Sequence, residues 1–323
     1  MASLNYFSDR SLGPDVAERA IALWDLGRGP AGAAAAPAGP VRLTHLGTSG
    51  NAVYRVDPGP FILRLTDPAH RTFEHCVSET SFLSHLDASG VRVAAPVCSS
   101  ARQAVERVGE LSATVLTWAP GEIVRAGSRH WNEPFFRAWG RALGSIHAAS
   151  RTYAGPMRWE WHEENLIAQA DRFLPSDDGL ARSELARVRS RLVELPMTPA
   201  NYGMTHADFG PQNFHYDAAS HGIASFDFGN CCRHWYVSDL AISLSTLRRE
   251  PDRELYKDWI LGGYREVADL DPAVWAELDT FLQLRILYVY LSRLEAFGSR
   301  ADGEQRATIA QLRGMVAKRF TWS

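Results

Sequence analysis

Apolar residues recur at helical spacing near the start of the chain and at every second position further on. Residues 14–26 begin with Pro14, which is well tolerated at the first position of a helix, and carry their apolar side chains on one face. From residue 41 the period changes to two, in three short runs at 41–46, 52–56 and 61–65. The pattern therefore predicts a short amphipathic helix followed by an antiparallel meander.

A second helix is predicted over residues 74–89, where apolar residues lie three and four positions apart and Gly90 follows as a stop signal. Two more β-prone runs come next, at 104–108 and 111–116. The stretch 117–121 then contains Pro and Gly, which end a sheet and open a loop. A β-rich segment is thus expected to end at this loop.

Beyond the loop the apolar spacing is mostly helical. His147 shares the inner face of the first helix there, and we interpret it as a hydrogen-bonded core histidine. Short strands are predicted at 204–206 and 222–226. The predicted helices span residues 132–149, 180–194, 235–249, 253–268, 273–297 and 303–318.

The composition favours a globular protein with room for two domains. The chain has 323 residues, of which 46% are hydrophobic, and a formal net charge of −3. No block of Lys and Arg is present that would track a nucleic-acid backbone, so nucleic acid is not an expected partner. The N-terminus lacks the pattern of a secretory signal and no window is apolar enough to span a bilayer, so neither secretion nor membrane insertion is indicated.

The cysteines favour a reducing compartment, and we expect the protein to be cytoplasmic. Cys76, Cys98, Cys231 and Cys232 are unevenly spaced and include no Cys-x-x-Cys pair of the kind that binds zinc. We interpret the adjacent Cys231 and Cys232 as packing residues, because buried free thiols behave as small hydrophobic groups.

The residues that carry chemistry concentrate in two stretches late in the chain. Asp208 and Asn213 lie five positions apart in a loop that contains Gly and Pro, and His206 stands two positions before Asp208. Asp227 follows the run predicted as a strand and is itself followed by Phe and Gly. Such residues also make ordinary turns. Their joint order, however, is the His-x-Asp, Asn and Asp-Phe-Gly order of kinase-like phosphotransferases.

The chemistry of phosphoryl transfer gives each of these residues a role. The reaction needs a group that orients the attacking hydroxyl and takes its proton, which the carboxylate of Asp208 can do. It also needs hard oxygen ligands for Mg²⁺, and the amide of Asn213 and the carboxylate of Asp227 supply them. We therefore predict Asp208 as the catalytic base and Asn213 and Asp227 as the metal ligands.

With these motifs the chain resembles the aminoglycoside phosphotransferase and choline kinase-like superfamily, over about residues 41–300. Residues 226–241 are most similar to the branch of type II homoserine kinases and stress-response kinases. The resemblance implies an α+β, two-lobed protein-kinase-like fold, with an antiparallel sheet and one main helix in a small N-terminal lobe and a larger, mainly helical C-terminal lobe. We expect an N-terminal helix and a flexible Ala/Gly/Pro loop at 1–40, a nucleotide-binding lobe at 41–118 and a catalytic and substrate-binding lobe at 119–323.

The resemblance also implies ATP as the phosphoryl donor. The loop after the first predicted strand is similar to the family's glycine loop, in which backbone N–H groups approach the phosphates. Adenine is implied to bind through backbone groups at the end of the last predicted strand of the sheet. The residues assigned to the nucleotide in this way are Gly47, Ser49, Gly50, Asn51, Arg64, Glu79, Thr117 and Trp118.

Arg64 and Glu79 are expected to form an ion pair. Arg64 stands where protein kinases carry the lysine that binds the α- and β-phosphates, and a guanidinium can hold two phosphate oxygens at once. Glu79 lies on the inner face of its predicted helix, where a carboxylate needs a partner. The alternative is that Arg64 is a solvated strand residue and Glu79 a border carboxylate exposed to water.

We predict an ATP- and Mg²⁺-dependent phosphotransferase that acts on a hydroxyl of a small molecule, such as an aminoglycoside-like antibiotic, homoserine or an amino alcohol. The protein is expected to be a monomer or a homodimer. A protein Ser/Thr acceptor is the alternative within this class. A catalytically silent pseudokinase is the alternative outside it, and the presence of Asp208, Asn213 and Asp227 argues against it.

Carboxylates alternate with indole rings in the stretch 159–164, which follows Gly155 and Pro156. Aromatic faces beside carboxylates favour a cation. We therefore predict that Glu160 and Glu163 bind an amine of the acceptor. The alternative is that the two Trp residues anchor the loop while the acidic side chains face water.

Overall fold

Among the described residues, six strands of the N-terminal part pair into one antiparallel sheet; five of them coincide with the predicted runs, and the two-residue strand Pro96–Val97 was not predicted. The computed structural model describes residues 14–26, 41–48, 50–319, 321 and 322. The strand order is β1-β2-β3-β6-β4, and β5 pairs with β6. The strands are β1 (Arg42–Thr48), β2 (Asn51–Asp57), β3 (Phe61–Thr66), β4 (Pro96–Val97), β5 (Glu106–Val108) and β6 (Leu111–Thr117).

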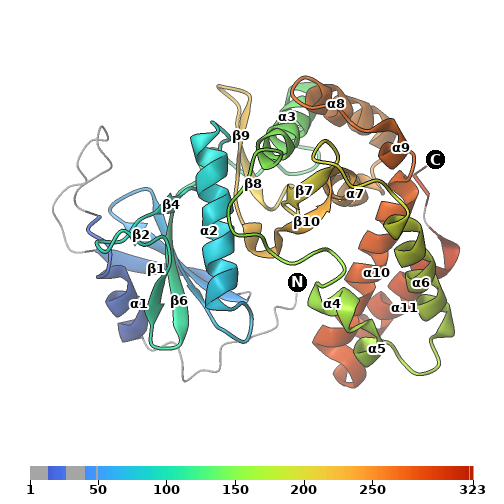
Figure 1. Ribbon diagram of the computed structural model, residues 1–323, viewed down its shortest axis with the longest axis horizontal. Helices are drawn as coiled ribbons and strands as arrows, with labels where there is room; N and C mark the ends of the chain where they lie inside the picture. The colour runs from blue at the N-terminus through green and yellow to red at the C-terminus, as the bar shows by residue number, and fades with distance from the viewer. Residues whose placement is uncertain (1–13, 27–40, 49, 320, 323) are drawn as a thin grey trace. The chain divides into compact units, whose positions relative to one another are not determined.

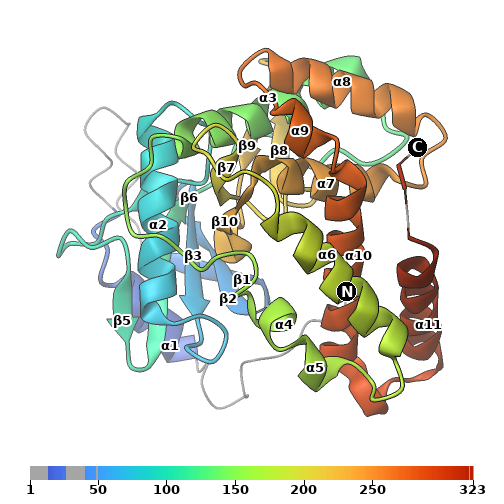
Figure 2. The same ribbon diagram turned by 45° about the vertical axis from the view of Figure 1, so that its right-hand side comes forward.

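Two helices accompany this sheet, α1 (Pro14–Ile21) and α2 (Phe73–Ala88). Helix α2 begins with a capping box at Thr72 and packs against β4 and β6; Figures 1 and 2 show it running along the sheet. Helix α1 adds apolar side chains, including Trp24 just beyond its end, to the core around the inner residues of β2, β3 and β6. The sheet with its two helices forms the first of two units, which comprises the chain up to Pro120 together with Ala154–Pro156.

The second unit comprises Gly121–Tyr153 and Met157–Ser323 and is mainly helical. Helix α10 packs against α6, α7 and α11, and helix α3 packs along α8 (Figures 1 and 2). None of the described helices is both long and apolar enough to cross a membrane. The helices are α3 (Glu133–Ser150), α4 (Asn165–Ala168), α5 (Ala170–Phe173), α6 (Gly179–Val193), α7 (Tyr236–Leu247), α8 (Arg253–Arg265), α9 (Pro272–Trp275), α10 (Leu278–Phe297) and α11 (Gly303–Lys318).

Two small antiparallel ribbons in this unit carry the loops that the sequence marks for chemistry. Strand β7 pairs with β10, and β8 pairs with β9. Of these, β8 and β10 were not predicted. The strands are β7 (Tyr202–Thr205), β8 (Phe214–Asp217), β9 (Gly222–Ser225) and β10 (Cys232–Trp235).

The helix predicted over 273–297 is divided in the structure. Helix α9 ends at Trp275, and α10 begins at Leu278. The side chain of Asp271 accepts hydrogen bonds from the first free N–H groups of α9, with Pro272 at its first position. This cap defines a separate short helix, which apolar spacing alone does not reveal.

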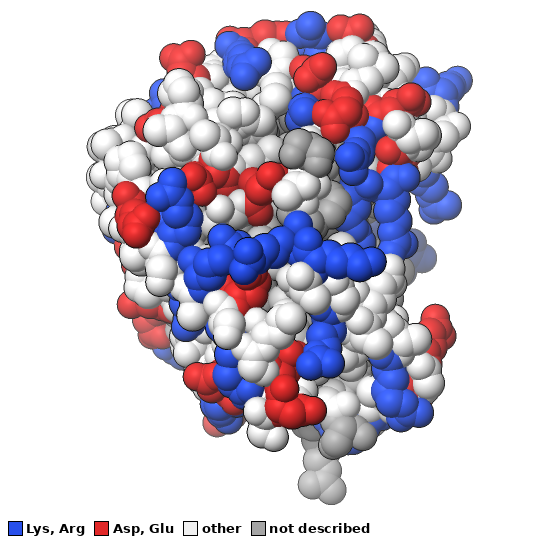
Figure 3. Space-filling model, turned by 90° about the vertical axis from the view of Figure 1, so that its right-hand side faces the viewer, with Lys and Arg blue, Asp and Glu red and all other residues white. Residues whose placement is uncertain are grey.

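Many charged side chains of the helical unit are paired with one another. Figure 3 shows a band of Lys and Arg across one face, with Asp and Glu alongside. Around helices α6 and α11, Glu184 contacts both Arg187 and Arg319, the residue after α11, and Arg313 contacts Asp178, the residue before α6. These carboxylates offset part of the positive charge that α6 and α11 carry.

Candidate functional site

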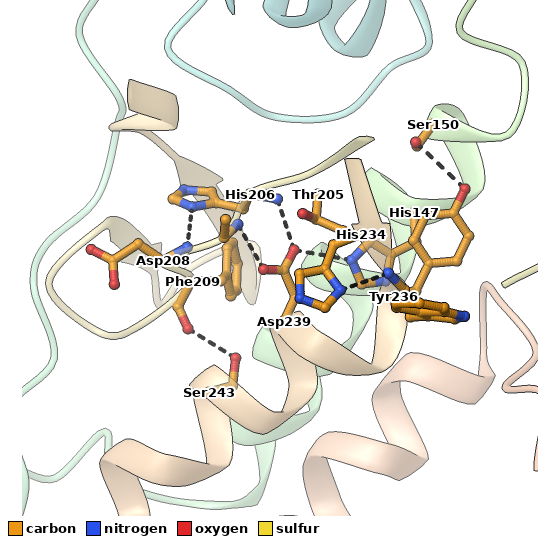
Figure 4. Close-up of polar contacts among 12 residues, drawn as sticks. His147, Ser150, Thr205, His206, Asp208, Phe209, His234, Tyr236, Asp239 and Ser243 are labelled. Atoms are coloured by element: carbon orange, nitrogen blue, oxygen red, sulfur yellow. Dashed lines mark hydrogen bonds and ion pairs between the residues drawn. The ribbon is translucent and has the colours of Figure 1, made fainter. Parts of the chain in front are cut away.

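The loop that carries Asp208 begins where β7 ends, and a buried carboxylate holds its first residues. Asp239, on α7, is fully buried. Its Oδ2 accepts a hydrogen bond from the backbone N–H of His206 and its Oδ1 one from that of Ala207, each at 2.7 Å (Figure 4). Two backbone donors at the start of the loop are thus fixed by one side chain.

Asp239 is itself held by a chain of hydrogen bonds. Nε2 of His147 lies 3.2 Å from Asp239 Oδ2, and Nδ1 of His147 lies 2.9 Å from the Tyr264 hydroxyl. Burial lowers the pKa of His147, so its ring is neutral and donates from Nε2 while Tyr264 donates to Nδ1. Burial alone would raise the pKa of Asp239, but the hydrogen bonds from His147 and from the loop backbone lower it. His147 is thus a hydrogen-bonded core residue, as predicted.

The side chain of His206 links the backbone of Asp208 to that of Phe226 by hydrogen bonds. Its Nδ1 accepts from the backbone N–H of Asp208 at 3.3 Å, which leaves Nε2 to donate to the Phe226 carbonyl at 3.0 Å. On the other side of Asp208, the Ser243 hydroxyl donates to the Phe209 carbonyl at 2.9 Å. The backbone on both sides of Asp208 is therefore hydrogen-bonded to the surrounding fold (Figure 4).

The carboxylate of Asp208 remains partly accessible and contacts two side chains. Nη2 of Arg285, on α10, donates to its Oδ1 at 2.8 Å, and Nδ2 of Asn213 lies 3.2 Å from its Oδ2. The same Nδ2 donates to the Asp208 carbonyl at 2.8 Å. The Asp208 side chain is 25% exposed. The predicted base is thus oriented by an arginine and an amide without being buried.

The β8–β9 ribbon brings the two predicted metal ligands to neighbouring backbone positions. Asn213 precedes β8, and its carbonyl accepts a hydrogen bond from the N–H of Phe226 at 3.0 Å. Asp227 is the next residue after Phe226 and has a left-handed backbone, with φ of +64°. Because Nδ2 of Asn213 is directed to Asp208, the amide oxygen is the atom of Asn213 that can serve a cation.

In the N-terminal unit, Arg64 and Glu79 form the predicted ion pair. Nη1 and Nη2 of Arg64 donate to the two carboxylate oxygens of Glu79 at 2.7 and 2.9 Å. Arg64 on β3 is 5% exposed and Glu79 on α2 is 2% exposed. The pair is bidentate and buried, so neither alternative of a solvated side chain applies.

The other residues assigned to the nucleotide also lie in this unit, except Ser49, which is outside the described residues. Gly50 has φ of +73°, a conformation that favours glycine, and a Cβ there would come within 2.5 Å of the His70 ring, which would have to move. Asn51 accepts a hydrogen bond from the Thr66 hydroxyl, and Gly47 lies in β1 opposite Val53, next to an irregularity in the β1–β2 register.

Thr117 and Trp118 use their backbone N–H groups within the unit. The N–H of Thr117 donates to the Ala95 carbonyl and that of Trp118 to the Pro60 carbonyl. Donation from these two groups to adenine is therefore precluded in this conformation, and a contact there would use a carbonyl oxygen.

The three carboxylates of the stretch 159–164 make different contacts. Glu160 pairs with Arg233 at 2.8 Å and accepts from the Tyr202 hydroxyl. Glu163 accepts from the backbone N–H of Glu160, and Glu164 caps the first N–H groups of α4. The substrate role of Glu160 and Glu163 stays a prediction.

A pocket in the helical unit opens beside Asp208. Ala207, the residue before Asp208, and Arg285, which holds its carboxylate, both line it. Glu164 is the acidic residue of the 159–164 stretch that reaches its lining. The remaining lining is largely apolar and aromatic, with Trp161, Ile167, Ile242, Phe281, Leu284 and Tyr288, together with Asn230, Cys232, His234 and Ser238.

The sequence reasoning missed Arg285, Asp239 and the pocket. Arg285 lies 77 positions from its partner Asp208, in a helix whose apolar spacing gives no sign of a functional charge. Asp239 falls within the stretch that carries the family resemblance, but no role was assigned to it. The DLA order around it was the one signal that could have pointed to it.

Taken together, the antiparallel unit with its buried Arg–Glu pair and the helical unit with its Asp208 loop define a kinase-like phosphotransferase fold. A family model described as "Phosphotransferase enzyme family" (APH) matches residues 42–278. The chain belongs to this family and is a phosphotransferase, which confirms the family and the fold predicted from the motifs.

Three relatives illustrate the likeness. Amicoumacin kinase of Bacillus subtilis (strain 168) is 31% identical over 82% of this chain and 83% of its own length. Homoserine kinase of Caulobacter vibrioides is 23% identical over 69% of this chain and 71% of its own. The solved structure of amicoumacin kinase hAmiN in complex with AMP-PNP, Ca²⁺ and Ami has a TM-score of 0.84 and 26% identity, and covers 97% of this chain and 94% of that one.

Proposed function

We propose that this protein transfers the γ-phosphoryl group of ATP to a hydroxyl of a small, amine-bearing molecule, with Asp208 as the catalytic base. The observation that carries the proposal is the setting of Asp208. Its backbone is fixed on both sides, its carboxylate is partly exposed, and a pocket lies beside it. A carboxylate held in this way can orient a hydroxyl and accept its proton.

Magnesium is the divalent ion that we propose for the nucleotide, held by Asn213 and Asp227. Among the described residues no group of three or more His, Cys, Asp and Glu side chains could hold a metal ion. This donor set fits Mg²⁺ bound with a nucleotide, because that ion is usually held by one or two carboxylates, water and phosphate oxygens. When bound, the ion would neutralise charge on the phosphates. The hAmiN complex, which contains AMP-PNP and Ca²⁺, supports a nucleotide with a divalent cation.

Arg64 is proposed to bind the α- and β-phosphates, and Glu79 to keep its guanidinium in place. Nη1 and Nη2 of Arg64 both donate hydrogen bonds to Glu79, so the orientation of the guanidinium is fixed before a nucleotide binds. The glycine loop at Gly47, Ser49, Gly50 and Asn51 is proposed to contact phosphates. Thr117 and Trp118 are proposed to face adenine through carbonyl oxygens, since their N–H groups are occupied.

The pocket beside Asp208 is the site that we propose for the acceptor. It is lined by side chains of the helical unit and bounded by aromatic rings, which suits a small molecule better than an extended peptide segment. The relatives named amicoumacin kinase and homoserine kinase support a small-molecule acceptor. For the amine of the acceptor we retain Glu160 and Glu163 as candidates and add Glu164, because Glu164 lines the pocket.

The proposal is tested with purified protein, MgATP and a panel of hydroxyl compounds, by coupled measurement of ADP release. The panel contains amicoumacin, L-homoserine, 1-amino-2-propanol and kanamycin, with casein as a protein acceptor. We expect acceptor-dependent ADP release with an amine-bearing small molecule and none in the Asp208→Asn variant. Phosphorylation of casein alone would replace the proposal by a protein kinase, and the absence of any MgATP binding would replace it by a silent module.

The three carboxylates are separated by steady-state kinetics on Glu160→Gln, Glu163→Gln and Glu164→Gln. A raised acceptor KM with an unchanged KM for ATP identifies a residue that binds the acceptor. We expect this for Glu164→Gln. If only Glu160→Gln or Glu163→Gln shows it, the acceptor site extends beyond the pocket, and if none does, the amine is bound elsewhere.

A further inference from the structure

One hydroxyl in the proposed acceptor pocket has no hydrogen-bond partner among the described residues. Ser238 lies in the first turn of α7, is 5% exposed and lines the pocket. Its Oγ makes no hydrogen bond with any described residue. A buried hydroxyl without a hydrogen bond is unfavourable. Such a group in a pocket wall is a position where a ligand atom can form the missing bond.

The neighbouring serines of the same helix are satisfied. Ser243 donates to the Phe209 carbonyl at 2.9 Å, and Ser245 donates to the Ile242 carbonyl at 2.7 Å. The state of Ser238 is therefore not imposed by its helix. It follows from the position of this side chain at the pocket, one residue before the loop anchor Asp239.

His234 adds a second polar group to the same pocket. Its Nδ1 accepts the backbone N–H of Trp235 at 2.9 Å, so the ring proton is on Nε2. Burial lowers the pKa of His234 to about 3, which keeps the ring neutral. The centroid of the His234 ring lies 5.4 Å from that of Trp161 and 5.7 Å from that of Phe281. Both aromatic residues line the pocket, so they fix the orientation of the His234 ring. Figure 4 shows it beside the Asp239 network.

We propose that Ser238 and His234 form a specificity subsite that binds a neutral carbonyl oxygen of the acceptor. Both side chains can donate a hydrogen bond, one from a hydroxyl and one from Nε2–H, and a carbonyl oxygen has two lone pairs to receive them. The apolar and aromatic walls would surround the group that carries this carbonyl. A carboxylate is disfavoured at this subsite, because its two donors are neutral and the guanidinium that lines the pocket, Arg285, is engaged by Asp208.

The inference rests on the proposed function in that the pocket is taken as the acceptor site, and it narrows the acceptor class. The acceptor would carry its hydroxyl and amine on a body with an ester, lactone or amide carbonyl beside an apolar or aromatic group. Simple amino alcohols and free amino acids lack this feature. They would then bind more weakly than a carbonyl compound of similar size.

Two probes that differ only in this carbonyl test the subsite. Serine benzyl ester has a hydroxyl, an amine, an ester carbonyl and an aromatic ring, and 2-amino-3-benzyloxypropan-1-ol has a methylene in place of the carbonyl. Binding is measured by calorimetry with wild-type protein, Ser238→Ala, and the control Ser245→Ala, which changes a satisfied serine of the same helix. We expect the ester to bind wild type about a hundredfold more tightly than the ether, since each of the two hydrogen bonds in a desolvated site is worth about tenfold.

Ser238→Ala should reduce this preference about tenfold by weakening the ester while leaving the ether unchanged, and Ser245→Ala should preserve it. His234→Phe, which keeps the ring but not the N–H, should also reduce the preference. Equal affinity of wild type for the two probes, no binding of either, or an equal loss for both in Ser238→Ala would overturn the subsite. Because binding is measured without turnover, an ester that binds with this preference and releases no ADP would contradict the proposed function and leave the subsite standing.

Discussion

The two units of this protein fix a charged side chain in opposite ways. In the N-terminal unit, Arg64 is buried and is oriented directly by the carboxylate of Glu79. In the helical unit, the carboxylate of Asp208 is left partly exposed, and the buried carboxylate of Asp239 instead holds the backbone that leads to it. One unit orients the charged group itself, and the other orients the chain that carries it.

The difference follows from what each group is proposed to do. A guanidinium that binds phosphates acts as a fixed charge, so a buried partner that holds its fork improves its geometry. A base must meet a hydroxyl and exchange a proton, so it needs a free approach and a fixed position at the same time. The four predictions that follow separate these two designs, from the largest expected effect to the smallest.

The largest effect is expected from Asp208→Ala. Removal of a positioned base lowers the rate by about 10² to 10⁴, whereas calorimetry with AMP-PNP and Mg²⁺ should show nucleotide affinity within a few-fold of wild type. Turnover above roughly a third of the wild-type value, with the acceptor that reacts best, would remove Asp208 from this role. Asp227→Ala is the contrasting variant, because it should weaken binding of the magnesium nucleotide itself.

The next effect concerns Glu79→Gln in the N-terminal unit. Loss of one partner of a buried ion pair destabilises by about 3 to 5 kcal/mol, because the other charge stays buried. Thermal melting should show this loss, and ATP should bind more weakly. A double variant, Arg64→Met with Glu79→Leu, should recover most of the stability and still fail to bind ATP. Normal ATP binding by the double variant would show that the pair is structural.

Asp239→Asn should have a smaller effect on stability. An amide presents one acceptor oxygen, so at least one of the backbone donors of His206 and Ala207 loses its partner, at about 1 to 3 kcal/mol. Because the loop then holds Asp208 less firmly, kcat should fall by more than tenfold while the KM for ATP stays near wild type. A melting shift without a change in kcat would limit Asp239 to a structural role.

The smallest effect is on the pH dependence of stability. Burial lowers the pKa of His234 to about 3, whereas an unfolded histidine titrates near 6.5. Below about pH 6.5 the unfolded chain binds the extra proton first, so the free energy of unfolding falls as the pH drops from about 6.5 towards 3. At about pH 5.5, protonation of His234 in the unfolded chain should account for about 1 kcal/mol of the fall in the free energy of unfolding. His234→Phe should not show this part of the fall. Urea unfolding at a series of pH values measures it, and an unchanged slope would contradict a neutral His234.

The sequence predicted those parts of the site whose partners are close in the chain or belong to a known order. Asp208 and Asn213 share one loop, and the structure joins them by two hydrogen bonds from a single amide. Arg64 and Glu79 are separated by 15 positions, across a strand and the following helix, and the inner-face position of Glu79 was enough to predict their pair. The antiparallel meander was equally readable from its period of two.

What the sequence did not predict depends on how helices pack. The contact of Arg285 with Asp208 requires α10 to pass the catalytic loop, and Asp239 reaches the loop only because α7 follows β10 directly. Glu160 shows the reverse case. The alternation of Glu and Trp predicted that Glu160 binds a cationic group of the acceptor. In the structure, Glu160 forms an ion pair with Arg233.

Helix α7 places two kinds of residue next to each other, and this arrangement bears on how such enzymes diversify. Asp239 and Ser243 hold the loop, whereas Ser238 and Ile242, each one position earlier, face the pocket. In the proposed acceptor site, substitutions at the pocket positions would therefore alter which compound is recognised while the backbone of the Asp208 loop keeps its shape. A gene duplicate could acquire a new acceptor through a few such replacements without first losing its ability to transfer phosphate.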